Sequence, residues 1–270
     1  MHILDFHTHI YPETISEKAV HSVSAFYGID VNRSGTAETL LQLGKASGVD
    51  RFVVQSVAVA PRNVEAINTF IASACAAHPE FCGFGTLHPE MGDPEKEIQR
   101  IEALGLRGVK LHPDTQQFFM DEPKAMALYE RLAGRLPVLI HCGDYRYDYS
   151  HPRRLAAVLD RFPDLTVIAA HFGGWSLFDL ALEYLEHRSC YLDLSSSIPF
   201  LGLRRTKELI RAYGADRILF GSDFPMWDPG QTLSQVKKLG LTDEELEKIL
   251  WTNGRDLLGL CKRNKLETGE

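Results

Sequence analysis

The chain has 270 residues, of which 44% are hydrophobic and 24% charged, and its formal net charge is −7. This composition is typical of a globular enzyme and excludes a small disulfide-stabilised scaffold. The acidic balance argues against a nucleic-acid partner, and five cysteines without a C-x-x-C pair argue against a disulfide framework. No basic leader and no long apolar stretch stand out, so we expect a cytoplasmic protein without a membrane partner.

Eight short runs rich in Val, Ile, Leu and Phe recur along the chain, each followed by a stretch with helical periodicity. A strand followed by a helix, repeated in this way, is typical of parallel β/α architecture, and eight repeats predict a (β/α)8 TIM barrel. No Pro/Gly/Ser-rich linker interrupts the series, so we expect residues 1–270 to form a single domain. The runs lie at 3–7, 51–57, 82–87, 107–112, 137–141, 166–171, 190–194 and 217–222.

The segment between the first two runs departs from this rhythm. Residues at about 10–35 form an insertion after the first strand, with one helix expected near 16–26. Loops at the carboxyl ends of barrel strands usually form the substrate pocket, so we expect this insertion to shape it. The alternative is a covering segment with packing contacts only.

Later helices have recognisable starts and buried faces. Asp93 before Pro94 predicts an N-cap with proline at the first helical position, and the segment from Thr242 to Glu245 has the pattern of a capping box. One apolar stripe with helical spacing is expected to pack against the sheet, and it consists of Val64, Ile67, Ile71 and Ala74.

Two histidines close the first strand. His7 and His9 are two residues apart, so both side chains are expected on one face of the strand at the barrel mouth. Neutral imidazole is a good ligand for zinc and its first-row neighbours. The H-x-H pattern by itself is also compatible with two polar residues at an edge. Asp5 shares the alternation of His7 and is either an orienting hydrogen-bond partner or an inner-barrel polar residue.

Polar residues also end three other strands. His141 ends the fifth run, His171 ends the sixth, and Asp223 follows the eighth. The carboxyl ends of barrel strands meet at one rim, where several buried polar groups need a shared partner. We therefore predict one divalent metal ion bound by His7, His9, His141 and Asp223. A metal-bound water is acidic enough to react near neutral pH, with Asp223 as its base and His171 as a further catalytic group.

The fourth run carries Lys110 and His112 on one face. A modified lysine or an additional histidine could bridge a second metal ion. We favour one metal, because the ligand set above is complete, and we assign His112 to the wall of the pocket. His88 and Cys142 follow other runs and are interpreted as structural, since no base is evident for the Cys142 thiol.

The loops after the strands are expected to hold the substrate. An arginine there suits a substrate carboxylate, and aromatic side chains suit a flat or apolar body. Each of these residues alone is equally compatible with an ordinary solvated loop. The candidates are Arg62, Tyr145, Arg146 and Trp175, with Trp227 nearby.

The motifs DFHTHIYP, KLHP, LIHCG, AHFGG, LFGSDFP and TNGRDLLGL, in this order along nearly the whole chain, resemble those of the amidohydrolase superfamily and of its family 2 branch. The resemblance implies that His7, His9, His141 and Asp223 are the ligands of a mononuclear site and that His171 is the acid/base histidine. It also implies zinc as the metal, with manganese and other ions known in the family. Gly254 stands where the family more usually has alanine.

The resemblance is compatible with two reactions. Arginines that would clamp a substrate carboxylate cannot be aligned with certainty, so our first hypothesis is metal-dependent hydrolysis of a small amide, ester or lactone by a metal-activated water. The alternative is non-oxidative decarboxylation of an unsaturated or aromatic carboxylic acid, in which His171 delivers a proton to carbon. A third hypothesis is a metal-binding barrel without catalytic activity. The expected partner is a small molecule, and a homodimer remains open.

Overall fold

Parallel strands form the centre of the molecule in the computed structural model, which describes residues 1–260. Seven of the eight predicted runs each overlap one strand, and the run 82–87 overlaps two short strands separated by Phe84. The strands are β1 (Leu4–His9), β2 (Arg51–Gln55), β3 (Phe81–Gly83), β4 (Gly85–Thr86), β5 (Val109–Leu111), β6 (Val138–Ile140), β7 (Val167–Ala169), β8 (Tyr191–Asp193) and β9 (Ile218–Leu219).

Backbone hydrogen bonds close these strands into a barrel. The sheet β1–β2–β3 continues into the sheet from β4 to β9, because Phe84 donates to the Val54 carbonyl at 2.9 Å and the next residue donates to Gly108 at 2.9 Å. On the opposite side, the Phe6 N–H donates to the Phe220 carbonyl at 2.7 Å, which joins β1 to the end of β9. The predicted (β/α)8 TIM barrel is therefore confirmed.

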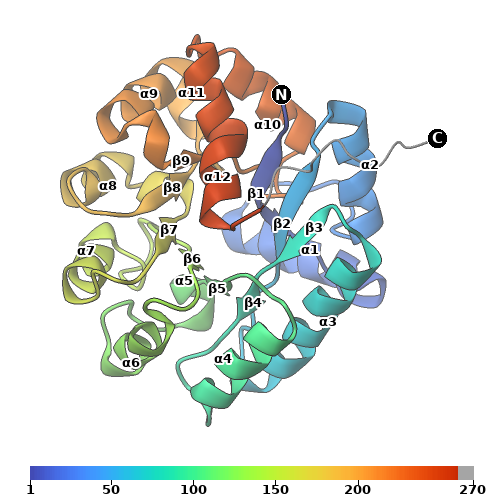
Figure 1. The fold of residues 1–270 in the computed structure, drawn as a ribbon, viewed down its shortest axis with the longest axis vertical. Coiled ribbons are helices and arrows are strands. Elements are labelled where there is room, and N and C mark those ends of the chain that lie inside the picture. Colours follow the sequence, from blue (N-terminus) through green and yellow to red (C-terminus); the bar gives the residue numbers. More distant parts are fainter. Residues whose placement is uncertain (261–270) are drawn as a thin grey trace.

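Helices surround the strands on all sides (Figure 1). They are α1 (Glu13–Tyr27), α2 (Ala37–Ser47), α3 (Val64–Ala77), α4 (Pro94–Ala103), α5 (Pro113–Gln116), α6 (Pro123–Leu132), α7 (Pro152–Arg161), α8 (Phe178–Leu185), α9 (Ile198–Tyr213), α10 (Pro229–Lys237), α11 (Asp243–Glu247) and α12 (Asn253–Leu257). No helix among the described residues has the length and apolar character needed to cross a membrane.

The predicted helix starts are present. Asp93 caps α4 by accepting from the Lys96 N–H, and Thr242 and Glu245 form the capping box of α11. The stripe of α3 differs in one position, because Ile67 is only half-buried whereas Asn68 is fully buried. The Asn68 amide is paired with the backbone of Thr86 through two hydrogen bonds, which ties α3 to β4 and satisfies the buried amide.

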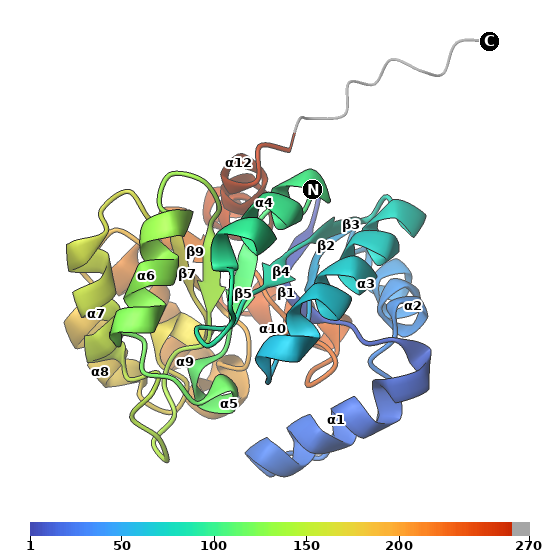
Figure 2. The same cartoon turned by 90° about the horizontal axis from the view of Figure 1, so that it is seen from below.

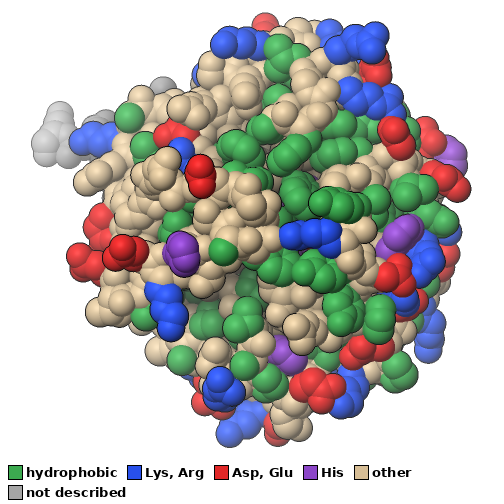
Figure 3. All heavy atoms as spheres, turned by 180° about the vertical axis from the view of Figure 1, so that it is seen from behind, with side chains coloured by type: hydrophobic (Ala, Val, Ile, Leu, Met, Phe, Trp, Pro, Cys, Tyr) green, Lys and Arg blue, Asp and Glu red, His purple; other side chains and the backbone are tan. Residues whose placement is uncertain are grey.

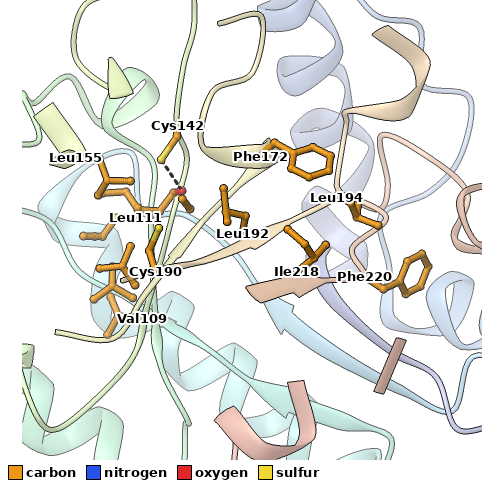
Figure 4. Packing of buried hydrophobic residues seen from close by; sticks show 14 of the residues in the cluster. Val109, Leu111, Cys142, Leu155, Phe172, Cys190, Leu192, Leu194, Ile218 and Phe220 are labelled. Atoms are coloured by element: carbon orange, nitrogen blue, oxygen red, sulfur yellow. Dashed lines mark hydrogen bonds between the residues drawn. The ribbon is translucent and has the colours of Figure 1, made fainter. Parts of the chain in front are cut away.

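The main hydrophobic core lies between the outer face of the strands and the helices. Figure 4 shows part of it, with Val109 and Leu111 from β5, Leu192 from β8 and Ile218 from β9. Cys142 belongs to this core, and its thiol donates to the Ile140 carbonyl, as its structural interpretation predicted. The four cysteines among the described residues, Cys75, Cys82, Cys142 and Cys190, are free thiols, and Cys261 lies outside the described residues.

A second core fills the amino-terminal end of the barrel. Leu4 and Phe6 pack there with Trp251 from the carboxyl-terminal part of the chain. Gly254 in α12 faces the same two β1 side chains, and a Cβ atom at this position would lie 2.8 Å from Leu4 Cδ2. The departure from the more usual alanine therefore allows a closer approach of α12 to β1.

The insertion after β1 lies at the opposite end of the barrel from α12. Figure 2 shows α1 extending across this side of the molecule, beyond the other helices. Gly28 caps the carboxyl end of this helix with a φ of 65°, which glycine adopts readily. The loop that follows is held by Arg33, which donates to the carbonyls of Pro225 and Met226 at 2.7 and 2.9 Å. The insertion thus reaches the chain segment that follows Asp223.

Candidate metal centre and active site

The histidines and the aspartate predicted as site residues meet at the carboxyl ends of the barrel strands. His7 and His9 lie in β1, and the others follow β6, β7 and β9. All of them line one cavity of about 900 Å³ between the barrel rim and α1. The cavity-lining predicted residues are His7, His9, His112, His141, His171 and Asp223.

Three ligand atoms converge in a way that fits a divalent metal ion. His7 Nε2 lies 3.2 Å from His9 Nε2 and 3.4 Å from Asp223 Oδ1, and the His9 nitrogen lies 3.7 Å from the same oxygen. A tetrahedral ion with bonds of about 2.0–2.1 Å separates its ligands by about 3.4 Å. The distances between these three atoms therefore match those between three of the ligands of a tetrahedral metal ion.

Two hydrogen bonds fix the tautomer of His7. Its Nδ1–H donates to Asp193 Oδ2 at 2.8 Å, while its Nε2 accepts from the buried ammonium group of Lys110 at 3.1 Å. Nε2 is therefore the ring nitrogen that carries a lone pair and no proton, as a metal ligand requires. Burial lowers the pKa of Lys110 to about 8.

Asp193, and not Asp5, is the carboxylate that orients the imidazole of His7. Asp5 instead accepts hydrogen bonds from the backbone N–H groups of His7 and Ser222. The reason is an extra residue in β1, where Asp5 pairs with Phe52 but Thr8 pairs with Val54, so the alternation of side chains breaks between them. Burial raises the pKa of Asp5 to about 7.

The remaining two ligands are in the protonation states that metal binding needs. Burial lowers the pKa of His9 well below its usual value and keeps the ring neutral. Burial opposes ionisation of Asp223, but the neighbouring His7 and His171 and the Ser196 hydroxyl outweigh it and hold the Asp223 pKa below its usual value. A neutral imidazole and a carboxylate are ordinary ligands of divalent ions.

His141 lies beside His171 and outside the group of three ligand atoms. Its Nε2–H donates to the Gly143 carbonyl at 3.0 Å, and its Nδ1 lies 3.0 Å from His171 Nε2. His171 in turn donates from Nδ1 to the Ser195 carbonyl at 3.0 Å. Two nitrogen lone pairs therefore face each other, and a proton or cation between them relieves the repulsion. Coordination by His141 stays a prediction.

Backbone strain marks two of these positions. His171 has a φ of 57° and Asp223 a φ of 63°, a region that residues other than glycine adopt at a cost of about 1 kcal/mol or more each. Burial also lowers the pKa of His171 to about 4. Strained backbone with perturbed pKa values is typical of catalytic positions.

A second group of potential ligands adjoins the first. The rings of His112 and His141 stack with centroids 4.0 Å apart, and Asp114 Oδ2 lies 3.4 Å from His141 Nε2. Asp114 Oδ1 is buried without a hydrogen-bond partner, and burial raises the Asp114 pKa to about 7. His112, Asp114 and His141 could therefore hold a second metal ion, which was the alternative considered for Lys110 and His112. Binding of a second ion stays a prediction.

Tyr27, the last residue of α1, brings the insertion into contact with the site. His112 accepts at Nδ1 from the Thr115 N–H at 3.4 Å, so its Nε2–H donates to the Tyr27 hydroxyl oxygen at 2.7 Å. Burial raises the pKa of Tyr27 well above its usual value, which keeps the hydroxyl proton in place. This proton is available to a bound substrate.

Arg146 holds this end of α1 in place. Its guanidinium donates to both oxygens of the buried Asp144 at 2.9 and 2.7 Å and to the Phe26 carbonyl at 2.5 Å. The same group lies over the Phe26 ring, 4.8 Å from its centroid. Arg146 is therefore a support for the insertion, and it does not line the cavity.

An Arg146→Ala variant is expected to loosen the last turn of α1. The substitution removes charge-assisted hydrogen bonds worth about 1.5–3 kcal/mol, so backbone amides near Phe26 should exchange about tenfold to a hundredfold faster. Hydrogen exchange read by mass spectrometry measures this. Arg153→Ala is the control, because Arg153 makes an exposed ion pair with Asp148 in the same loop. Equal exchange in both variants would rule out the support.

The other residues predicted to contact substrate lie outside the cavity. Arg62 and Tyr145 are exposed, and neither lines the cavity. Trp175 is buried, and its ring contacts that of Tyr27 edge-on with centroids 5.1 Å apart. Trp227 donates to the Ser196 hydroxyl, which itself donates to Asp223. These tryptophans therefore support residues of the site.

An Asp193→Asn variant is expected to weaken metal binding about tenfold to a hundredfold, because loss of the charge that orients a ligand histidine has effects of this size. The dissociation constant can be measured by competition with a chromogenic chelator. Asp5→Asn is the matched control, since this buried carboxylate accepts from the backbone N–H groups of His7 and Ser222 and not from the His7 ring. An equal loss of affinity in both variants would contradict the orienting role of Asp193.

The barrel, with a cluster of histidines and carboxylates at its mouth, places this protein in the class of metal-binding TIM barrels. The amidohydrolase family model matches residues 4–260. The chain belongs to the amidohydrolase family, in the family 2 branch that its motifs predicted.

Individual proteins that are similar to this chain include decarboxylases and an uncharacterised barrel protein. The chain is 25% identical to gamma-resorcylate decarboxylase of Polaromonas sp. (strain JS666), over 77% of this chain and 80% of that protein. An uncharacterised TIM-barrel protein from Bordetella bronchiseptica has the same fold, with a TM-score of 0.74, 23% identity, and 96% of this chain and 99% of that chain covered.

The structure of dihydroxybenzoic acid decarboxylase from Polaromonas sp. JS666 also has this fold. Its TM-score is 0.74 and its identity 17%, with 98% of this chain and 99% of that chain covered. That protein was solved with manganese and the inhibitor 2-nitroresorcinol. The two of these proteins whose names state an activity are decarboxylases, which is the reaction of our alternative hypothesis and not of our first one.

Proposed function

We propose that the protein is a metal-dependent, non-oxidative decarboxylase of a small aromatic or unsaturated carboxylic acid. The observation that carries this proposal is the similarity to gamma-resorcylate decarboxylase over 77% of the chain, together with the three-ligand group at the rim. Hydrolysis of a small ester, amide or lactone is the second candidate, because a metal-activated water would serve it equally well.

The residues supply complementary parts of this reaction. We propose that His7, His9 and Asp223 hold one divalent ion with His141, zinc by the family resemblance or manganese as in the related structure. When bound, the ion would supply charge stabilisation for the acid. The buried Lys110 ammonium and the Tyr27 hydroxyl also line the cavity and add hydrogen-bond donors.

The reaction needs one proton at carbon. The bond between the substrate carbon and its carboxylate breaks, CO2 leaves, and the electron pair stays on that carbon, which then takes a proton. We assign this transfer to His171 Nε2, which faces His141 Nδ1 and carries no proton in the free site, because the other ring nitrogen donates to the Ser195 carbonyl. Nε2 would first take a proton from the acidic hydroxyl or carboxyl group of the substrate, or from water, and then deliver it to carbon. α1 and Tyr27 cover this end of the cavity and limit the access of water.

The test measures decarboxylation and hydrolysis side by side with the metal-loaded protein. Hydroxybenzoates, including 2,6-dihydroxybenzoate, are assayed for CO2 release, and a panel of lactones and esters is assayed for hydrolysis. We expect CO2 release that stops on chelation and returns with the divalent ion. Hydrolysis without CO2 release would reverse the assignment in favour of the second candidate.

A further inference from the structure

The cavity continues well beyond the metal-binding residues. From the rim it extends between α1 and the opposite wall formed by the segment after β2 and by α3. We call this part the outer groove, and it is defined by Ile15, Val23 and Phe26 on one side and Val59, Ile67 and Phe70 on the other.

The outer groove becomes more open with distance from the site. His7 and His171 at the rim are buried, Ile67 and Phe70 are half-buried, and Ile15 and Val59 are 50% and 59% exposed. Hydrophobic side chains gather near the middle of the face on which α1 lies (Figure 3). Apolar side chains that face each other across an open groove are typical of a binding surface for an apolar ligand.

The charges in the cavity are divided in the same way. The carboxylates among its lining residues are Asp114 and Asp223, and both belong to the rim. The lining of the outer groove adds the exposed Lys18 and Ser22 and the half-buried Asn63 as polar residues. The polar chemistry is therefore concentrated at the metal-binding end.

The size of the cavity exceeds what a single ring requires. At about 900 Å³ it lies near the upper end of the range of about 300–1,000 Å³ for small-molecule sites, which accommodates drug-sized ligands. A hydroxybenzoate held at the rim would leave the outer groove unfilled.

We infer that the outer groove binds an apolar substituent, an alkyl or aryl chain, on the acid whose carboxyl group lies at the rim. This inference rests on the proposed function for the position of the carboxyl group, and it narrows the substrate class to aromatic acids with an extended apolar group opposite the carboxylate. Side chains of α1 and α3 form the walls of the groove, and contact with them does not require the reaction to occur. The assignment can therefore be tested by ligand binding as well as by turnover.

The experiment uses a series of 2,6-dihydroxybenzoates with hydrogen, ethyl, butyl or hexyl at the position opposite the carboxylate. Dissociation constants are measured by calorimetry and kcat/KM by CO2 release, both with metal-loaded protein. Burial of one methylene group improves binding about fourfold, and a half-open groove should retain about twofold to fourfold per methylene. We expect both quantities to improve steadily up to the hexyl compound.

Two variants introduce a negative charge into the apolar outer groove. Ala66→Asp and Val59→Asp place a carboxylate at exposed positions that line the outer groove, so they should not disturb the core. We expect the preference for hexyl over hydrogen to fall about tenfold. Ala76→Asp is the matched control, because Ala76 is exposed on the same helix and does not line the cavity. The control should keep the full preference.

The outcomes separate this inference from the proposed function. If affinity rises with chain length but no CO2 is released, the assignment of the outer groove is supported and the proposed decarboxylation is contradicted. CO2 release with affinity and kcat/KM independent of chain length would retain decarboxylation and overturn the groove assignment. A preference for a chain ending in a carboxylate over the hexyl compound would also overturn it, since Lys18 would then determine the binding.

Discussion

An Asp223→Asn variant is expected to lose both the metal ion and activity. Asp223 supplies the only carboxylate oxygen in the group formed with His7 and His9, at 3.4 and 3.7 Å from their Nε2 atoms. Replacing it with a neutral amide removes the charge that favours a divalent ion. Because the ion contributes several kcal/mol of charge stabilisation, we expect kcat/KM to fall at least about 10³-fold.

Elemental analysis of the purified variant gives the metal content, and CO2 release gives the activity. Asp228→Asn is the matched control: Asp228 caps α10 in the same region of the chain, and asparagine is an equally good cap. The control should keep one ion per chain and full activity. An Asp223→Asn protein with full metal content and unchanged turnover would contradict the assignment of the ligand group.

The position of the site was predictable because of barrel geometry. His7, His171 and Asp223 lie far apart in the sequence, yet each follows or ends an apolar run, and the carboxyl ends of parallel strands share one rim. Asp193, which orients His7, also follows apolar residues: it lies in the run 190–194 and is the last residue of β8. Applying the argument to every strand end would have identified it.

Other features depend on packing that a linear pattern does not contain. The extra residue between Asp5 and Thr8 changes which carboxylate reaches His7, and an alternating pattern gives no sign of it. Tyr27 contacts His112 at the end of α1, and the neighbouring Phe26 carbonyl accepts from Arg146, which lies in a loop about 120 residues later in the chain. Arg62 was a reasonable carboxylate partner by type, but it lies in the turn before α3 and is exposed.

A His171→Asn variant is expected to retain the metal ion and lose the chemical step. His171 lines the cavity and contacts His141 at 3.0 Å, but the ligand group of His7, His9 and Asp223 forms without it. Loss of a positioned proton carrier lowers rates about 10²-fold to 10⁴-fold, and we expect this loss in kcat, with KM changed little.

Two measurements distinguish this role from a structural one. Elemental analysis should give an unchanged metal content, and turnover in D2O should still place one deuterium on the product carbon at the reduced rate. His88→Asn is the matched control, because His88 is a buried histidine outside the cavity that accepts from the Glu90 N–H, and asparagine can also accept there. If His171→Asn instead lost the metal ion together with activity, His171 would be a metal ligand, and the proton would have to come from another group. The position of its ring beside those of His7 and His141 would be consistent with that outcome.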